Sequence, residues 1–147
     1  MVVALNSVGS ATLKQLNNAE QSRAHHLARG LMAEIIGLDY QDPDGTPGFG
    51  PESGEDKPGT RANFDDVDDY HGWKASPPEE NDGTPLADFA GWLRGVIVEY
   101  VSPDDLTRVA GTDKGVKRVT VIVIRNNTEM ACLTMIVTDS WQRPPYE

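Results

Sequence analysis

The first 38 residues carry an unbroken helical repeat, which constrains the fold more than any other feature of the chain. Apolar or small side chains recur at steps of three to five residues, at Leu5, Val8, Thr12, Leu16, Ala19, Ala24, Leu27, Leu31, Ile35 and Leu38. Such steps place one stripe of side chains on one face of an α-helix, and no proline precedes Pro43. We therefore predict one helix over about residues 2–37, which at 1.5 Å per residue is roughly 50 Å long. One small domain cannot cover a helix of that length, so one end should project or pack against another protein.

The negative charge of the chain is concentrated in its middle. Residues 39–82 hold 13 acidic and three basic residues, and their net charge of −10 equals that of all 147 residues. Glycine and proline are frequent there, which is typical of a surface loop. A chain this acidic lacks the basic stripe that a broad nucleic-acid-binding surface needs. The single cysteine, Cys132, excludes an intramolecular disulfide.

The last third of the chain has the β-branched content and alternation of strands. We predict strands at Trp92–Val101, Val116–Arg125 and Met130–Thr138, the last two joined by the polar turn Asn126–Glu129. Asparagine tolerates the positive φ that hairpin turns demand, so these two strands should form a hairpin. Alternation predicts a core-facing row in the last strand and a partner row in the strand before it. The two rows are Ala131, Leu133, Met135 and Val137, and Val119, Val121 and Val123.

The chain is thus predicted to be one α+β domain in three parts. Residues 1–38 form the long helix, residues 39–85 the acidic Gly/Pro-rich loop region, and residues 86–147 an antiparallel sheet with a C-terminal tail. A sheet of three to four strands packed across the C-terminal half of the helix would bury the apolar faces of both.

The candidate metal site is a cluster of four carboxylates within five residues, namely Asp65, Asp66, Asp68 and Asp69. Ca²⁺ takes several oxygen ligands, so calcium is the one candidate cofactor. An EF-hand is excluded, because Tyr70 and His71 stand where that motif requires Asp or Asn and then Gly. The alternative is an acidic turn whose side chains accept hydrogen bonds from local backbone N–H groups. Cations near in sequence that would offset the mutual repulsion are Lys57, Arg61 and Lys74.

No motif of the chain carries a recognisable chemistry. The serines lack a G-x-S-x-G context, and there is no glycine-rich phosphate loop. The His25–His26 pair has no carboxylate at metal-ligand spacing, so we expect a solvated helix face there. We therefore predict no catalytic residues and no enzyme. Two other hypotheses stay open: a calcium-binding or adhesive extracytoplasmic module, and a soluble enzyme with its active site in the acidic loop.

Three segments together resemble type IV pilin-like proteins, in particular minor pilins and the minor pseudopilins of type II secretion systems. Residues 24–35 read A-x-x-L-A-x-x-L-M-x-E-I and are followed by an aromatic residue and Asp42-Pro43, as at the end of the long helix of that family. Residues 64–73 are similar to the acidic, aromatic loop of these prepilin-type proteins. Residues 116–123 resemble their penultimate strand, and all three segments occur in the family's order.

The resemblance implies a structural subunit that acts by protein–protein assembly, with other pilins or pseudopilins as partners through the N-terminal helix. It implies a head that is periplasmic while the subunit is anchored in the inner membrane, or that lies on an extracellular pilus after assembly. The family begins with a basic leader and about 20 apolar residues, the length of a membrane helix, of which only Val2–Leu5 has a counterpart here. We expect the chain as given to be soluble.

Overall fold

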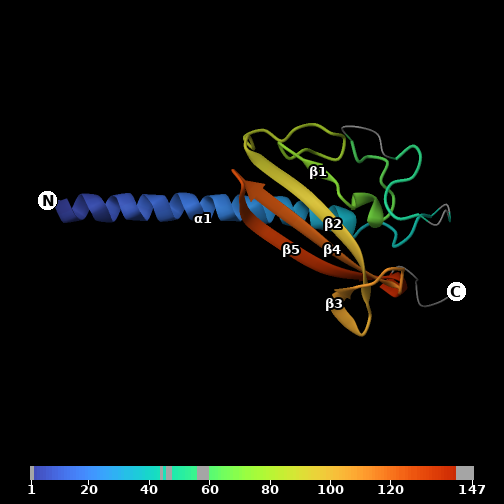
Figure 1. The fold of residues 1–147 in the computed structure, drawn as a ribbon. Helices are drawn as coiled ribbons and strands as arrows, with labels where there is room; N and C mark the ends of the chain where they lie inside the picture. Colours follow the sequence, from blue (N-terminus) through green and yellow to red (C-terminus); the bar gives the residue numbers. More distant parts are fainter. Residues whose placement is uncertain (1, 44, 46–47, 56–59, 142–147) are drawn as a thin grey trace.

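The computed structural model describes residues 2–43, 45, 48–55 and 60–141, with side chains from residue 15 to residue 140. One long helix, α1 (Val2–Ile35), meets a five-stranded antiparallel sheet (Figure 1). The strands are β1 (Lys74–Ala75), β2 (Trp92–Ser102), β3 (Asp105–Val109), β4 (Val116–Arg125) and β5 (Thr128–Thr138). Two 3-10 turns complete the chain, η1 (Asp68–Tyr70) and η2 (Asp139–Trp141).

The sheet has the order β1-β2-β4-β5, and β3 pairs separately with the end of β2. Val121 in β4 lies opposite Val96 in β2 and Leu133 in β5, which fixes one face of three strands toward the helix. Asn126 and Asn127 take positive φ values of 48° and 63° between β4 and β5. The predicted hairpin is therefore confirmed, because asparagine is among the few residues that adopt this conformation at low cost.

The core lies between the C-terminal half of α1 and the inner face of β2, β4 and β5. The helix contributes a buried stripe at helical spacing, which includes Leu27, Leu31 and Ile35 as predicted. The predicted row of β4 is fully buried at Val119, Val121 and Val123. The helix ends near its predicted stop at Gly37, where the last N–H groups bond only three residues back, from Gly37 to Glu34 and from Leu38 to Ile35.

The α+β class and the helix-on-sheet arrangement are confirmed, but the sheet has five strands rather than three to four. Between the predicted strands at Trp92–Val101 and Val116–Arg125, residues Asp105–Val109 form an additional strand, β3, in which every residue is exposed. The two-residue strand β1 falls within the predicted loop region. Both are short and polar or flanked by turns, so neither carries the alternation by which a strand is predicted.

The predicted core-facing row of β5 is only partly confirmed. Ala131 and Val137 are buried and Leu133 is half-buried against the core, but 39% of the Met135 surface is exposed. β5 is an edge strand, and α1 crosses the sheet obliquely (Figure 1), so the helix does not cover every inward position of β5. Alternation predicts which face a side chain takes, whereas the neighbouring element decides whether that face is covered.

Candidate functional site

The Glu34 carboxylate of α1 binds several side chains of the acidic loop region. Its oxygens accept hydrogen bonds from Arg61 at 2.7 and 2.9 Å, from the Tyr70 hydroxyl at 2.6 Å and from Asn81 at 3.0 Å. Burial alone would raise the pKa of Glu34, but these hydrogen bonds and the Arg61 charge outweigh it and lower the pKa. Arg61 also stacks on Trp73, 4.6 Å from the ring centroid. One helical residue thereby joins three separate stretches of the loop region.

Two of the four clustered aspartates accept hydrogen bonds from local backbone, as the alternative interpretation predicted. Asp66 Oδ1 accepts from the N–H groups of Asp68 and Asp69 at 2.7 and 3.2 Å. Asp69 Oδ2 accepts from those of Asp65 and Asp66 at 2.9 and 3.1 Å. These reciprocal bonds fold the acidic run into the turn that leads into η1.

Asp68 has a different partner, the buried Lys117 of β4. The Lys117 ammonium pairs with the Asp68 carboxylate, donates to the Tyr40 carbonyl and lies 4.2 Å from the centroid of the Tyr40 ring. Both charged side chains are almost fully buried, and the second Asp68 oxygen accepts from Gly50 N–H at 3.0 Å. The ion pair and these hydrogen bonds offset the cost of burying both polar side chains.

Two of the cations expected to offset the acidic run have other surroundings: Arg61 pairs with Glu34, and Lys74 is exposed on β1. The third, Lys57, lies outside the described residues. The cation that pairs with the acidic run is Lys117, which is 49 residues from Asp68 in the chain. No local pattern could have found it, although a lysine inside an otherwise β-branched strand is a hint that the strand meets an acidic partner.

Two carboxyl groups beside this ion pair, those of Asp66 and Asp69, have raised pKa values. Burial, together with repulsion from Asp68, raises the pKa of Asp66 to about 7, although Lys117 opposes the shift. Burial raises the pKa of Asp69 to about 6, with added repulsion from Glu55 and Asp65, against the lowering effect of its backbone hydrogen bonds. Both shifts arise because carboxyl groups are buried close to one another around η1.

Two glutamates outside the predicted metal site, Glu52 and Glu55, lie close to Asp69. Carboxylate oxygens of Glu52, Glu55 and Asp69 lie within 4.8 Å of one another. Glu52 N–H donates to Glu55 Oε2 at 2.9 Å, so the two side chains are held on one turn. The available signal in the sequence is a pair of acidic residues three apart in a Gly/Pro-rich loop. Spacing alone does not show that this turn lies against Asp69.

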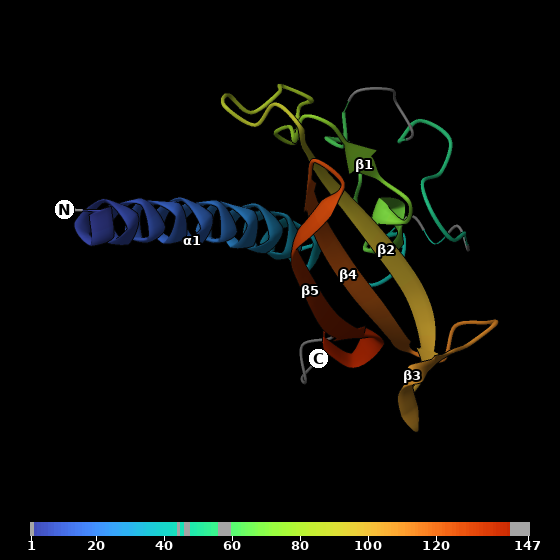
Figure 2. The same ribbon diagram turned by 60° about the vertical axis from the view of Figure 1, so that its left-hand side comes forward.

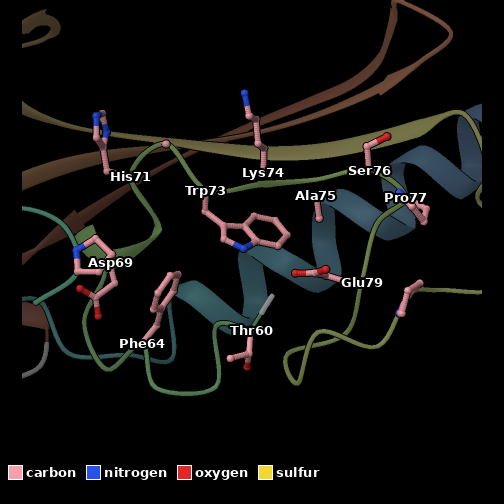
Figure 3. Close-up of a pocket in the computed structure, with 13 residues that line it drawn as sticks. Thr60, Phe64, Asp69, His71, Trp73, Lys74, Ala75, Ser76, Pro77 and Glu79 are labelled. Carbon is pink, nitrogen blue, oxygen red and sulfur yellow. The ribbon is translucent and has the colours of Figure 1, made fainter. Parts of the chain in front are cut away.

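An open groove of about 590 Å³ borders β1, and Trp73 lies at its centre with Phe64 and Glu79 on either side (Figure 3). Two side chains of this groove that could act as nucleophile or base, Ser76 and His71, hydrogen-bond to backbone. Ser76 donates to the Trp92 carbonyl at 2.9 Å, and His71 Nδ1 accepts from Val98 N–H at 3.3 Å. We assign no reaction to the groove.

The second candidate surface is the N-terminal half of α1, which extends away from the sheet in both views (Figures 1 and 2). The first buried helical side chain with described surroundings is Ala24. Before it, residues 15–19 are all exposed, and Leu16 exposes 56% of its surface. The predicted solvated face at His25 and His26 is confirmed, since both are exposed.

Among the described residues, no helix combines the length and apolarity needed to cross a bilayer. Comparisons of the chain with protein-family models, curated proteins and solved structures find no match.

Proposed function

We propose that this chain is a structural subunit of a type IV pilus or of a type II secretion pseudopilus, in the position of a minor pilin or minor pseudopilin. The observation that supports this most is the free half of α1, which continues as a regular helix well beyond the sheet (Figure 1). A helix gains most of its stability in water from packing of an apolar face. The free half therefore suits a helix that packs against neighbouring helices in an assembly.

In this proposal the two halves of α1 have different partners. The C-terminal half holds the head together through Leu27, Leu31 and Ile35. The N-terminal half contacts the helices of other pilins or pseudopilins, with the sheet and acidic loop region on the outside of the filament. The head would be periplasmic while the subunit is anchored in the inner membrane, or extracellular on a pilus.

The firm attachment of the loop region also supports an assembly role. Glu34 lies at the end of α1 and binds the loop region through Arg61, Tyr70 and Asn81. Displacement of the helix therefore carries the loop region with it. A filament subunit needs such coupling, because contacts made by the helix must fix the orientation of the surface that the head presents.

Photo-crosslinking in the cells that make the protein tests the proposal. A benzophenone amino acid in place of Asn18 puts the photoreactive group on the exposed part of α1, and the same amino acid in place of Arg108 puts it on the exposed strand β3. We expect the protein in sheared filaments, with the probe at position 18 yielding crosslinks to other filament subunits far more efficiently than the probe at position 108. Absence from the filament fraction, or equal crosslinking at both positions, would contradict the proposal.

A further inference from the structure

We propose that Glu52, Glu55 and Asp69 form a binding site for a divalent cation of the Ca²⁺ type, which joins the loop turn at residues 52–55 to the buried turn η1. The proposal concerns this head alone and does not depend on the role of the free helix.

The spacing of the ligand atoms matches one cation. One carboxylate oxygen from each residue lies within 4.8 Å of the other two. Ca²⁺ binds oxygen at 2.3–2.6 Å, so a small movement of the side chains brings all three atoms within reach of a single ion. Three carboxylates also leave room for the water or backbone ligands that complete a coordination shell of six to eight oxygens.

The state of Asp69 points to a missing partner. This residue is only 1% exposed, and its Oδ2 accepts two backbone N–H groups, from Asp65 and Asp66. Its Oδ1 is buried and has no hydrogen-bond partner within the described part of the chain. A buried carboxylate oxygen without a donor is costly, and a cation bound by the same carboxylate removes that cost.

Among the described residues, no protein cation supplies the compensation. None of the ion pairs found there involves Glu52, Glu55 or Asp69. Burial, the hydrogen bond to Glu55 and repulsion from Glu55 and Asp69 together raise the pKa of Glu52 to about 7. Lys117 pairs with Asp68, so the three carboxylates meet without a lysine or arginine partner in the part of the chain that the structure describes.

The origin of the ligands favours Ca²⁺ over Mg²⁺. Glu52 and Glu55 lie on a half-buried loop turn, whereas Asp69 lies in the buried turn η1. Mg²⁺ demands near-octahedral geometry at 2.0–2.1 Å and gives up its water reluctantly. A site assembled from carboxylates of two separate turns suits the larger ion, which accepts irregular and bidentate coordination.

Calorimetric titration of the metal-stripped chain with Ca²⁺ tests the site. We expect saturable binding of one Ca²⁺, a loss of affinity of at least about tenfold in the double variant Glu52→Gln/Glu55→Gln, and much weaker binding of Mg²⁺. Glu80→Gln is the matched control, because it removes the same charge from an exposed glutamate outside the proposed site and should bind like the parent chain. Asp69→Asn keeps an oxygen for the two backbone N–H groups, and should also lose Ca²⁺.

Three results of this titration would contradict the proposal or the assignment to calcium. The glutamates lie on a loop turn outside the core, so circular dichroism should show the double variant folded. Absence of saturable binding up to about 10 mM Ca²⁺, beyond the range of weak extracellular sites, would overturn the proposal. Undiminished binding in the double variant would place the ion elsewhere and also overturn it. Equal affinity for Mg²⁺ would overturn the assignment to calcium.

Discussion

The C-terminal half of α1 is buried against β4 and β5, whereas residues 15–19 of the same helix are exposed. Leu31 is fully buried and Leu16 exposes 56% of its surface, although both belong to one helical repeat. The difference shows that a regular apolar period predicts a helix without predicting what covers it. Since helices depend on packing for most of their stability, the two halves should differ in every measurement that reports packing.

Amide exchange should show the largest difference between the two halves. We expect backbone N–H groups from Leu27 to Ile35 to exchange only through global unfolding, and those before about Asn18 to exchange through local fraying. The rates should differ by several orders of magnitude, as measured by hydrogen–deuterium exchange on the isolated chain. Equal protection along the whole helix in a monomer would show that both halves are packed.

Truncation of equivalent leucines should show the same contrast in stability. Leu31→Ala removes a fully buried side chain and should lower the free energy of unfolding by about 2–5 kcal/mol. Leu16→Ala is the matched control on the exposed part and should change it by less than about 0.5 kcal/mol. Urea unfolding of the monomer measures both, and similar losses would contradict the assignment of the two halves.

The attachment of the loop region should depend on Glu34, which lies in the buried half of α1. Glu34→Gln keeps an acceptor for Tyr70 but removes the charge that faces the buried Arg61. The Glu34 side chain is 26% exposed, and loss of a hydrogen bond between charged groups costs about 1.5–3 kcal/mol. We expect a loss of that size, together with faster exchange around Asn81. An unchanged unfolding midpoint would show that the loop region does not depend on this carboxylate.

A smaller effect is expected at the partly covered end of the core. Leu133→Ala, at a half-buried position of β5, should cost about 1–2 kcal/mol, below the range for a fully buried leucine. Thr134→Ala, on the exposed face beside it, should cost less than about 0.5 kcal/mol. The reverse order in chemical denaturation would show that β5 is shifted by one residue, because such a shift exchanges its two faces.

A pH dependence is predicted for the loop that caps the buried half. The pKa of Asp66 is raised from 3.8 to about 7 in the fold, so its contribution to stability is complete below pH 3.8 and declines as the pH rises toward 7. The lowered pKa of Glu34 acts in the opposite sense, because its contribution is present above pH 4.5 and is lost on acidification.

Without divalent ions, urea unfolding should therefore give lower stability at about pH 7.5 than at about pH 5. Asp66→Asn keeps an acceptor for its two backbone donors and should reduce this difference. An unchanged pH profile in that variant would show that Asp66 does not ionise in this range.

Elements defined by short-range periodicity could be predicted from the chain alone. The helix follows from apolar residues every three to four positions over residues 2–35, and β4 was predicted with its observed bounds from its β-branched run. The β4–β5 turn follows from Asn126 and Asn127, which tolerate positive φ. In each case residues that are close in sequence determine the local structure, so the sequence alone predicts it.

Tertiary structure decided the partners. Whether Met135 is covered depends on where α1 crosses the sheet, and the partner of Asp68 is Lys117, 49 residues away. The approach of Glu52 and Glu55 to Asp69 depends in the same way on the path of a Gly/Pro-rich loop. Periodicity sets the direction of a side chain within its own element, whereas charge pairing and burial depend on contacts between elements that are distant in sequence. The chain by itself therefore determined a long helix, an acidic loop region and a hairpin, and only their packing decided which carboxylates are neutralised and which half of the helix stays free.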